Sequence, residues 1–176
     1  MSILTEKNSI PEVIPAKNSL LTLLLTIGVL VGITFAVYSP ALDNDFVDWD
    51  DYAYVIDNPL VRDPKTPISE IWKRPISLNY HPVTIWTMRL HAQGNRCDST
   101  KEKNCMEGIS ARPFIRWNII LHLLNVVLVF GLLYNLSRAN LILSSIAALW
   151  FGIHPMHVES VAWVYSEPKG CNTAQY

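Results

Sequence analysis

Charged residues are missing from a long stretch near the start of the chain. Residues 19–42 include no Lys, Arg, Asp, Glu or His, and charged residues make up only 16% of the whole sequence. A helix needs roughly 20 apolar residues to cross the hydrocarbon core of a bilayer. The stretch therefore predicts a first transmembrane helix over residues 19–42, and the composition excludes an ordinary soluble domain.

A cleaved signal peptide is the competing interpretation of this stretch. Its apolar core would be only about 7 to 15 residues long and would end in a small-x-small cleavage site. The apolar run here is longer, and Phe35, Ala36, Val37 and Tyr38 offer no such site. A retained helix is the preferred interpretation.

Basic runs and zinc-type cysteine pairs are also absent. The formal net charge is −1 and no segment interleaves basic with aromatic residues, so the sequence predicts no nucleic-acid partner. Of the three cysteines, Cys97 and Cys105 lie in one polar stretch at a spacing that suits no zinc motif. In an oxidising compartment these two could form a disulfide, and two unpaired thiols are the alternative.

Two further apolar runs follow in the second half of the chain. Residues 117–136 predict a second span, and residues 137–140 alone separate it from a third run that begins at Leu141. Such a short connection makes the two helices antiparallel neighbours. His154-Pro155 interrupts the third run, and proline removes a backbone donor and disfavours helix at the residue before it. We expect a transmembrane hairpin over residues 117–165, with a kink or helix end near His154.

The resulting fold class is all-α: a polytopic membrane bundle of about three spans with a large first loop over residues 43–116. Basic residues in short segments mark the cytoplasmic side of a membrane. Lys7 and Lys17 precede the first span, and Arg138 lies in the turn between the second and third. The N-terminus, with a leader over residues 1–18, is therefore expected in the cytoplasm.

The loop over residues 43–116 is then extracytoplasmic. Residues 69–72 and 82–90 are expected to form short helices in it, because Pro82 suits a first helical position. Their Trp, Ile and Met content, with basic residues nearby, is typical of helices that lie along the membrane interface. The lipid bilayer is the first expected partner.

An acidic motif begins close to the end of the first span and could carry chemistry. Asp50 and Asp51 are adjacent carboxylates among aromatic and aliphatic residues. Such a pair at a membrane surface could supply a general base, or could hold a hard divalent cation through its oxygens. A solvated acidic surface is the alternative.

A second polar group lies inside the third apolar run. His154, His157 and Glu159 are ionisable residues in an otherwise apolar segment, and such residues usually mark a site. They are expected to bind a phosphate or to orient a catalytic carboxylate, with interfacial packing as the alternative. Metal ligation is a further alternative, although the His-Glu-x-x-His arrangement of metalloproteases is absent.

Further polar candidates lie in the loop and in the second span. His81 and Arg89 could hold a lipid-linked phosphate, and interfacial anchoring is the alternative for Arg89. Asn118, His122 and Asn125 are spaced four and three apart, so they share one helical face. Such a stripe commonly joins helices by hydrogen bonds, and it predicts further transmembrane helices as partners.

Three ordered blocks of the sequence resemble a family of polytopic glycosyltransferases. The first is Phe46-Val47-Asp48-Trp49-Asp50-Asp51 followed by Asn58-Pro59, and the second joins Asn79-Tyr80-His81-Pro82-Val83-Thr84 to the segment 118–125. The third is the segment 154–164. The family includes bacterial proteins that join a transmembrane half to tetratricopeptide repeats, and the related animal O-mannosyltransferases.

The resemblance implies a type-C glycosyltransferase fold that uses a polyprenyl-phosphate sugar as donor and the Ser or Thr hydroxyls of an acceptor protein. It implies that Asp50 or Asp51, with Asp51 the first choice, acts as the catalytic base. Relatives continue for several more spans, whereas residues 166–176 are polar and patternless, which predicts a truncated or frame-shifted fragment that is inactive alone. The expected location is a bacterial inner membrane or, in a eukaryote, the endoplasmic reticulum.

Two other functions remain open on the sequence. One is a non-enzymatic membrane protein, either an inactive remnant or a partner that packs against other helices through the Asn118, His122 and Asn125 stripe. The other is a metal-binding sensor that uses His154, His157 and Glu159. The sequence specifies no cofactor. A bound divalent cation is the alternative.

Overall fold

The computed structural model describes residues 18–46, 51–76, 79–98, 100–101 and 105–164. Almost all of its regular structure is helical, and the two short strands are joined as a hairpin. In chain order the elements are α1 (Leu20–Tyr38), the 3-10 helix η1 (Ser39–Asp43), the π-helical turn η2 (Tyr52–Ile56), α2 (Pro59–Arg62), the 3-10 helix η3 (Ile68–Trp72), α3 (Pro82–Gly94), β1 (Cys105–Met106), β2 (Ile109–Ser110), α4 (Arg112–Leu136), α5 (Leu141–Ile153), the 3-10 helix η4 (Pro155–His157) and α6 (Val158–Ala162).

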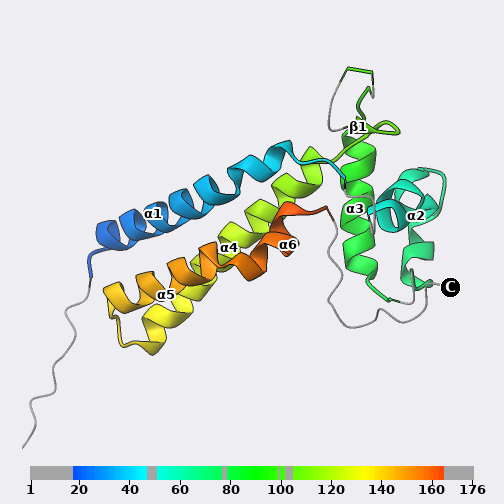
Figure 1. Ribbon diagram of the computed structural model, residues 1–176. Coiled ribbons are helices and arrows are strands. Elements are labelled where there is room, and N and C mark those ends of the chain that lie inside the picture. Colours follow the sequence, from blue (N-terminus) through cyan, green and yellow to red (C-terminus); the bar gives the residue numbers. More distant parts are fainter. Residues whose placement is uncertain (1–17, 47–50, 77–78, 99, 102–104, 165–176) are drawn as a thin grey trace, which may run out of the picture.

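Three long helices, α1, α4 and α5, lie side by side in an elongated bundle (Figure 1). α1 together with η1, and α4 by itself, are each long and apolar enough to cross a membrane, and α5 with the short helices after it forms a third, bent candidate span. The core between them is made of Leu30, Val126, Phe130 and Ala148. The predicted all-α membrane fold is therefore confirmed.

Side chains at the helix ends explain where the spans begin. The hydroxyl of Ser19 accepts a hydrogen bond from the N–H of Thr22 at the start of α1, and the side chain of Asn140 accepts one from the N–H of Leu143 at the start of α5. Both are preferred N-cap residues. α4 begins at Arg112, five residues before the predicted span, with Pro113 in its first turn.

The third span breaks at the predicted place. α5 ends at Ile153, and His154 has an extended backbone. In a continuous helix the N–H of Met156 would donate to the carbonyl of Gly152, but here it donates to Nδ1 of His154 at 3.3 Å. The carbonyl of Gly152 instead pairs with Nε2 of His122 at 2.8 Å. Because a carbonyl can only accept, Nε2 must carry the proton, and such re-pairing is what allows a helix break at membrane depth.

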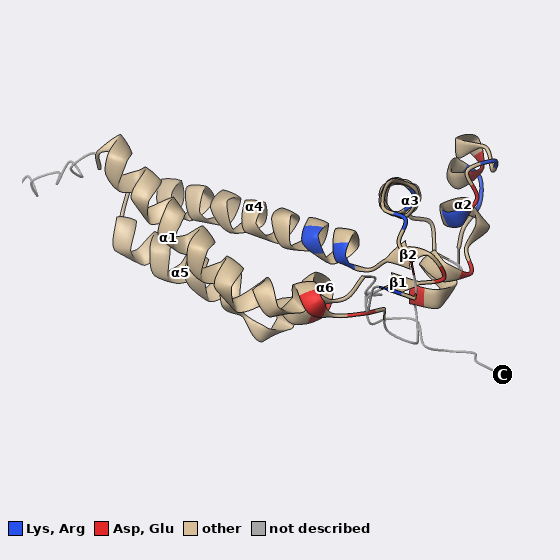
Figure 2. Cartoon of the chain, turned by 90° about the horizontal axis from the view of Figure 1, so that it is seen from above, with Lys and Arg blue, Asp and Glu red and all other residues tan. Residues whose placement is uncertain are grey.

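The loop region (residues 44–111) packs against one end of the bundle. α3 runs crosswise to the three long helices there, and Figure 2 looks nearly along its axis. Charged residues gather in this region and at the neighbouring ends of α4 and α6 (Figure 2). Two of the expected short helices are present as η3 and α3, so these sequence predictions are confirmed. The buried core of the region is shared with the bundle end and includes Tyr54, Val55, Ile56, Val61, Ile71, Ile85, Ala92, Ile109, Phe114 and Ile115.

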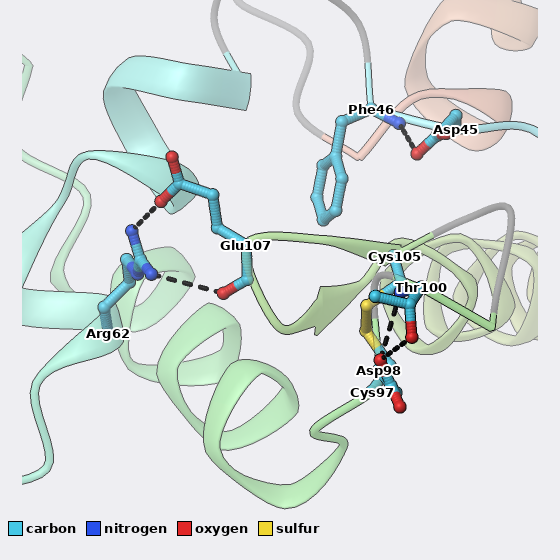
Figure 3. Close-up of a disulfide and its surroundings, with 8 residues drawn as sticks. All are labelled: Asp45, Phe46, Arg62, Cys97, Asp98, Thr100, Cys105 and Glu107. Carbon is cyan, nitrogen blue, oxygen red and sulfur yellow. Dashed lines mark hydrogen bonds and ion pairs between the residues drawn. A yellow bond between two sulfur atoms is a disulfide. The ribbon is translucent and has the colours of Figure 1, made fainter.

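A disulfide-closed hairpin caps the far end of α3. Cys97 and Cys105 are bonded, and the strands β1 and β2 reverse through Glu107 and Gly108, which both have positive φ (46° and 84°). Two-residue hairpin turns favour such values. The guanidinium of Arg62 donates to the carboxylate and to the carbonyl of Glu107, so α2 is joined to the hairpin (Figure 3).

We expect Gly152→Ala to destabilise the bundle. A Cβ at this position would lie 2.7 Å from Oγ1 of Thr34 and 3.1 Å from Cγ2 of Val126, and both neighbours are fully buried. Overpacking of this kind costs about 1–3 kcal/mol, which should lower the Tm of the detergent-solubilised protein. Gly28→Ala is the matched control, because a Cβ on Gly28 meets nothing within 4 Å. Equal Tm values for the two variants would show that α1 and α5 do not approach as closely as described.

Candidate functional site

A cavity of about 450 Å³ lies where the crosswise helix α3 meets the bundle. Three elements that are distant in sequence form its wall: α3, the first turns of α4, and the segment from α6 to Val164. The lining residues are His81, Val83, Thr84, Thr87, Met88, His91, Phe114, Trp117, Asn118, Leu121, Ser160 and Val164. The side chains of Val83, Trp117 and Leu121 are 59%, 40% and 42% exposed, so the cavity opens on the outer surface of the bundle.

The cavity wall is mostly apolar, includes several neutral polar groups and carries no full charge. None of its lining residues, all in the described part of the chain, is Asp, Glu, Lys or Arg. Hydroxyl, amide and imidazole groups come from three elements: Thr84 and Thr87 on α3, Asn118 on α4 and Ser160 on α6. The ring of Trp117 adds an aromatic surface. Aromatic surfaces with a few neutral hydrogen-bonding groups suit an uncharged, hydroxyl-rich ligand.

One end of the cavity combines an imidazole with a helix N-terminus. α3 begins at Pro82, and no side chain caps its first turn. His81, Val83 and Thr84 from this end all line the cavity. Nε2 of His81 is buried and has no hydrogen-bond partner within the described residues. An uncapped helix N-terminus attracts anions because its N–H groups and the helix dipole point the same way.

His91 joins the two main walls of the cavity. Its ring packs against the rings of Phe114 and Trp117, with both centroid distances 5.7 Å. This partial burial lowers the pKa of His91 below its usual value of 6.5, because desolvation penalises the charged form of an imidazole. His91 therefore stays neutral at the interface between α3 and α4.

The start of the acidic segment is fixed beside this cavity. Asp43 pairs with Arg112 at the start of α4 (3.0 Å), and the side-chain amide of Asn44 donates to the carbonyl of Ala162 at the end of α6 (3.2 Å). The ring of Phe46 meets the ring of Phe114, a cavity-lining residue, edge to face at 6.0 Å. Phe46, the last described residue before the predicted acidic pair, therefore packs against a residue of the cavity wall. The predicted Asp50 lies outside the described residues.

Asp51 is nearly inaccessible at the other end of this segment. Its side chain is 1% exposed, and it directly precedes η2. On η2, the hydroxyl of Tyr54 contacts the turn that leads to α3: it donates to the carbonyl of Ile76 (3.5 Å) and accepts from the amide of Asn79 (3.4 Å). The element that follows Asp51 is therefore joined to the turn that carries His81 into the cavity.

Arg89 turns away from the cavity. It is 5% exposed, and its guanidinium donates to the carbonyls of Leu60, Pro64 and Thr66 at 3.1, 3.1 and 2.7 Å. Three main-chain acceptors in one fork favour an anchoring role for Arg89 in the loop region. A phosphate contact by Arg89 stays a prediction that this geometry does not favour.

The His154, His157 and Glu159 group lies beside the cavity, and none of the three lines it. The ring of His157 packs on Phe151 at 4.6 Å and on His122 at 5.2 Å, while the ring of His154 lies 6.3 Å from that of His157. No group of three or more His, Cys, Asp or Glu side chains in the described residues is placed to hold a metal ion. The histidines join helices here, and their predicted phosphate contacts stay predictions.

The predicted polar stripe on α4 divides into two kinds of residue. The amide of Asn118 donates to the carbonyl of Trp163 at 2.8 Å, and His122 pairs with Gly152 as described. These two residues join helices inside the bundle, as expected. Asn125, one turn further, is exposed on the surface of the span.

Four polar residues of the cavity were not predicted as site residues from the sequence: Thr84, Thr87, His91 and Ser160. A signal for three of them exists, because Thr84, Thr87 and His91 are spaced three and four apart and so form a polar stripe on one face of α3. Ser160 gives no comparable signal. It reaches the cavity only because the chain bends after α5.

Acidification should loosen α3 from α4 through His91. The folded protein resists protonation of this imidazole at a pH where the unfolded chain would bind a proton. The free energy of unfolding therefore falls as the pH drops below about 6.5, the pKa in the unfolded chain. It levels off below the lowered pKa of His91 in the folded protein. We expect the Tm to fall between pH 7.5 and pH 5.5, and to fall less in His91→Phe, which keeps a ring but cannot titrate. An identical pH dependence in the two proteins would remove His91 as a cause.

Comparison with known proteins finds two relatives, each matched over only a small part of its own length. No family model matches the chain, and no solved structure matches it. Two curated proteins do. The chain is 30% identical over 149 residues to human (Homo sapiens) protein O-mannosyl-transferase TMTC1, a match that covers 77% of this chain and 15% of the relative. It is 29% identical over 149 residues to mouse (Mus musculus) protein O-mannosyl-transferase TMTC1, which covers 77% of this chain and 14% of that relative.

The chain thus spans about one seventh of the length of the curated relatives that it matches. The matched part includes most of the chain, and the relatives' name agrees with the family that the sequence blocks resemble. These identities support a distant relationship of this chain to the O-mannosyltransferase family.

Proposed function

We propose that the chain forms part of a membrane glycosyltransferase, which moves a sugar from a polyprenyl-phosphate donor to Ser or Thr hydroxyls of an acceptor protein. The observation that carries the proposal is the cavity between α3, α4 and α6, with Phe46, which precedes the acidic pair in the chain, packed against Phe114 of its wall. The distant relationship to protein O-mannosyl-transferases supports the same reaction class.

The donor's phosphate would lie at the N-terminus of α3, beside Nε2 of His81. The cavity has no Arg or Lys among its lining residues, so backbone N–H groups and this imidazole are its best anion donors. The sugar ring would extend toward Thr87, Asn118 and Trp117, where neutral polar groups and an aromatic ring meet. The polyprenyl chain would leave past Leu121 along the lipid-facing side of α4.

The acidic segment would supply the base, with Asp51 as first choice and Asp50 as second. A carboxylate accepts the proton of the attacking hydroxyl while the hydroxyl oxygen bonds to the anomeric carbon. The bond from that carbon to the phosphate oxygen breaks, and its electron pair leaves with the lipid phosphate. Asp43, Asn44 and Phe46, which precede these carboxylates in the chain, are held at the end of the bundle by contacts with Arg112, Ala162 and Phe114.

We further propose that the loop region faces away from the cytoplasm. A disulfide between Cys97 and Cys105 suits an oxidising compartment. Basic residues at the other end of the bundle, in the α4–α5 turn and before α1, favour the cytoplasm for that end. In this orientation the cavity lies at the surface of the membrane that faces away from the cytoplasm.

Asp51→Asn should lower sugar transfer by about 10²- to 10⁴-fold, because an amide cannot accept the proton of the attacking hydroxyl. The assay uses membranes that hold the complete glycosyltransferase of which the chain is proposed to form part, a radiolabelled polyprenyl-phosphate sugar and an acceptor peptide rich in Ser and Thr. Asp57→Asn is the matched control, since Asp57 is exposed at the opposite end of η2. Unchanged transfer by Asp51→Asn would mean that this carboxylate is not the base, and no transfer by the complete protein without substitutions would favour the non-enzymatic alternative.

His81→Leu should weaken binding of polyprenyl phosphate about tenfold, the effect of losing one hydrogen bond to a charged group at the low end of about 1.5 kcal/mol. The measurement is titration of this lipid into nanodiscs that contain the protein. His154→Leu is the comparison, because His154 lies outside the cavity wall and caps Met156. If His154→Leu weakens binding and His81→Leu does not, the phosphate lies at the break between α5 and α6 instead.

A further inference from the structure

The neutral polar groups of the cavity differ in their freedom to donate or accept hydrogen bonds. A hydroxyl can rotate its proton, and a neutral imidazole has one nitrogen of each kind, so the side chains of Thr84, His91 and Ser160 can serve a ligand in either role. Thr87 and Asn118 also line the cavity. They are different, because hydrogen bonds within the protein fix how each of them is oriented.

Thr87 offers a ligand only an acceptor. Its hydroxyl donates to the carbonyl of Thr84, three residues earlier on α3, at 2.8 Å. A carbonyl can only accept, and a hydroxyl has one proton and two lone pairs. The proton of Thr87 is therefore used inside the helix, and only the lone pairs of its oxygen remain for a group in the cavity.

Asn118 is oriented in the same sense on the opposite wall. Its side-chain nitrogen donates to the carbonyl of Trp163, just after α6, at 2.8 Å. The amide oxygen could not make this bond, because two acceptors cannot pair. The nitrogen end of the amide thus turns toward Trp163, and the oxygen lies on the other side, available to accept.

The two acceptors belong to one part of the cavity. His91, one turn after Thr87 on α3, packs against the ring of Trp117 with 5.7 Å between centroids. Trp117 directly precedes Asn118 on α4. Thr87 and Asn118 therefore lie near the place where the two walls meet, and a polar ligand group held there has to supply hydrogen-bond donors.

We propose that Thr87 and Asn118 determine which sugars the cavity takes, by accepting hydrogen bonds from free hydroxyl groups of the sugar ring. The inference rests on the proposed function, in which the donor's phosphate lies at the start of α3. Val83 and Thr84, in the uncapped first turn, precede Thr87 by four and three residues, or about 5 to 6 Å along the helix. A pyranose ring has a similar width, so a phosphate at the helix start brings the far hydroxyls of its sugar beside Thr87.

The ligand class follows from this arrangement. A hexose with free hydroxyls can donate to both oxygens. A sugar that is methylated or acylated at the same positions has no proton to donate and leaves the two acceptors unpaired. A site built to pair with a hydroxyl rejects an analogue that lacks the matching group. The expected donor is therefore a polyprenyl-phosphate hexose whose ring hydroxyls are unsubstituted.

The test is titration of short-chain polyprenyl phosphates that carry glucose, galactose or mannose into nanodiscs that contain the full chain. The tightest binder is then compared with its monodeoxyfluoro derivatives, one for each ring hydroxyl, because fluorine is close to a hydroxyl in size and cannot donate. Fluorine at one or more positions should weaken binding about twofold to tenfold, the range for one neutral hydrogen bond.

Thr87→Val removes the acceptor and keeps the shape of the side chain. It should weaken binding of the unsubstituted sugar by a similar factor and remove the effect of fluorine at one position. Thr87→Ser keeps the oxygen and should bind like the unmodified chain. Thr26→Val is the matched control, because Thr26 also donates to a carbonyl of its own helix at 2.8 Å but lies on α1, outside the cavity wall. Asn118 also joins α4 to the segment after α6, so Thr87 is the better position for this test.

Two results would overturn the inference: fluorine that leaves binding unchanged at every position, or fluorine effects that are the same in Thr87→Val as in the unmodified chain. If polyprenyl phosphate without a sugar binds in either case, the proposed phosphate site stands and only the role of Thr87 and Asn118 is wrong. If no lipid of the series binds the chain, the proposed function and the inference are both wrong.

Discussion

The helix break at His154-Pro155 leaves the main-chain carbonyl of Gly152 without its helical donor, and the end of this bundle is arranged around that carbonyl. His122 of α4 donates to the carbonyl of Gly152, and the missing side chain of Gly152 lets α1 approach through Thr34. Tyr38 of α1 then packs edge-on against the ring of His122 at 5.1 Å. This hydrogen bond joins α4 to α5, and packing by Thr34 and Tyr38 adds α1 where the third span changes direction.

The change of direction is what completes the cavity. After the break the chain bends by 44°, and α6 then contributes Ser160 to the cavity wall. The carbonyls of Ala162 and Trp163 accept hydrogen bonds from Asn44, the first residue of the loop region, and from Asn118, which follows that region. A continuous straight helix in place of α5 and α6 would leave both amides without these acceptors, and the wall opposite α3 would be missing.

Sequence patterns predicted the parts of the fold that depend on local composition. The apolar runs, the tight turn before Leu141, the break near His154 and the helix starting at Pro82 all follow from a few neighbouring residues. The cavity does not, because α3, α4 and α6 meet only in three dimensions. Arg89 illustrates the difference. From the sequence it is a cation near a membrane, and only its three carbonyl partners show that it points into the loop region.

The core of the loop region has no boundary with the spans. Phe114, Ile115 and Ile119 of α4, together with Val161 and Ala162 of α6, belong to the same buried cluster as Tyr54 and Val61 of the loop region. During synthesis these loop residues emerge before the helices that cover them. The loop residues of this cluster can therefore reach their final packing only after α4 and α6 have been synthesised.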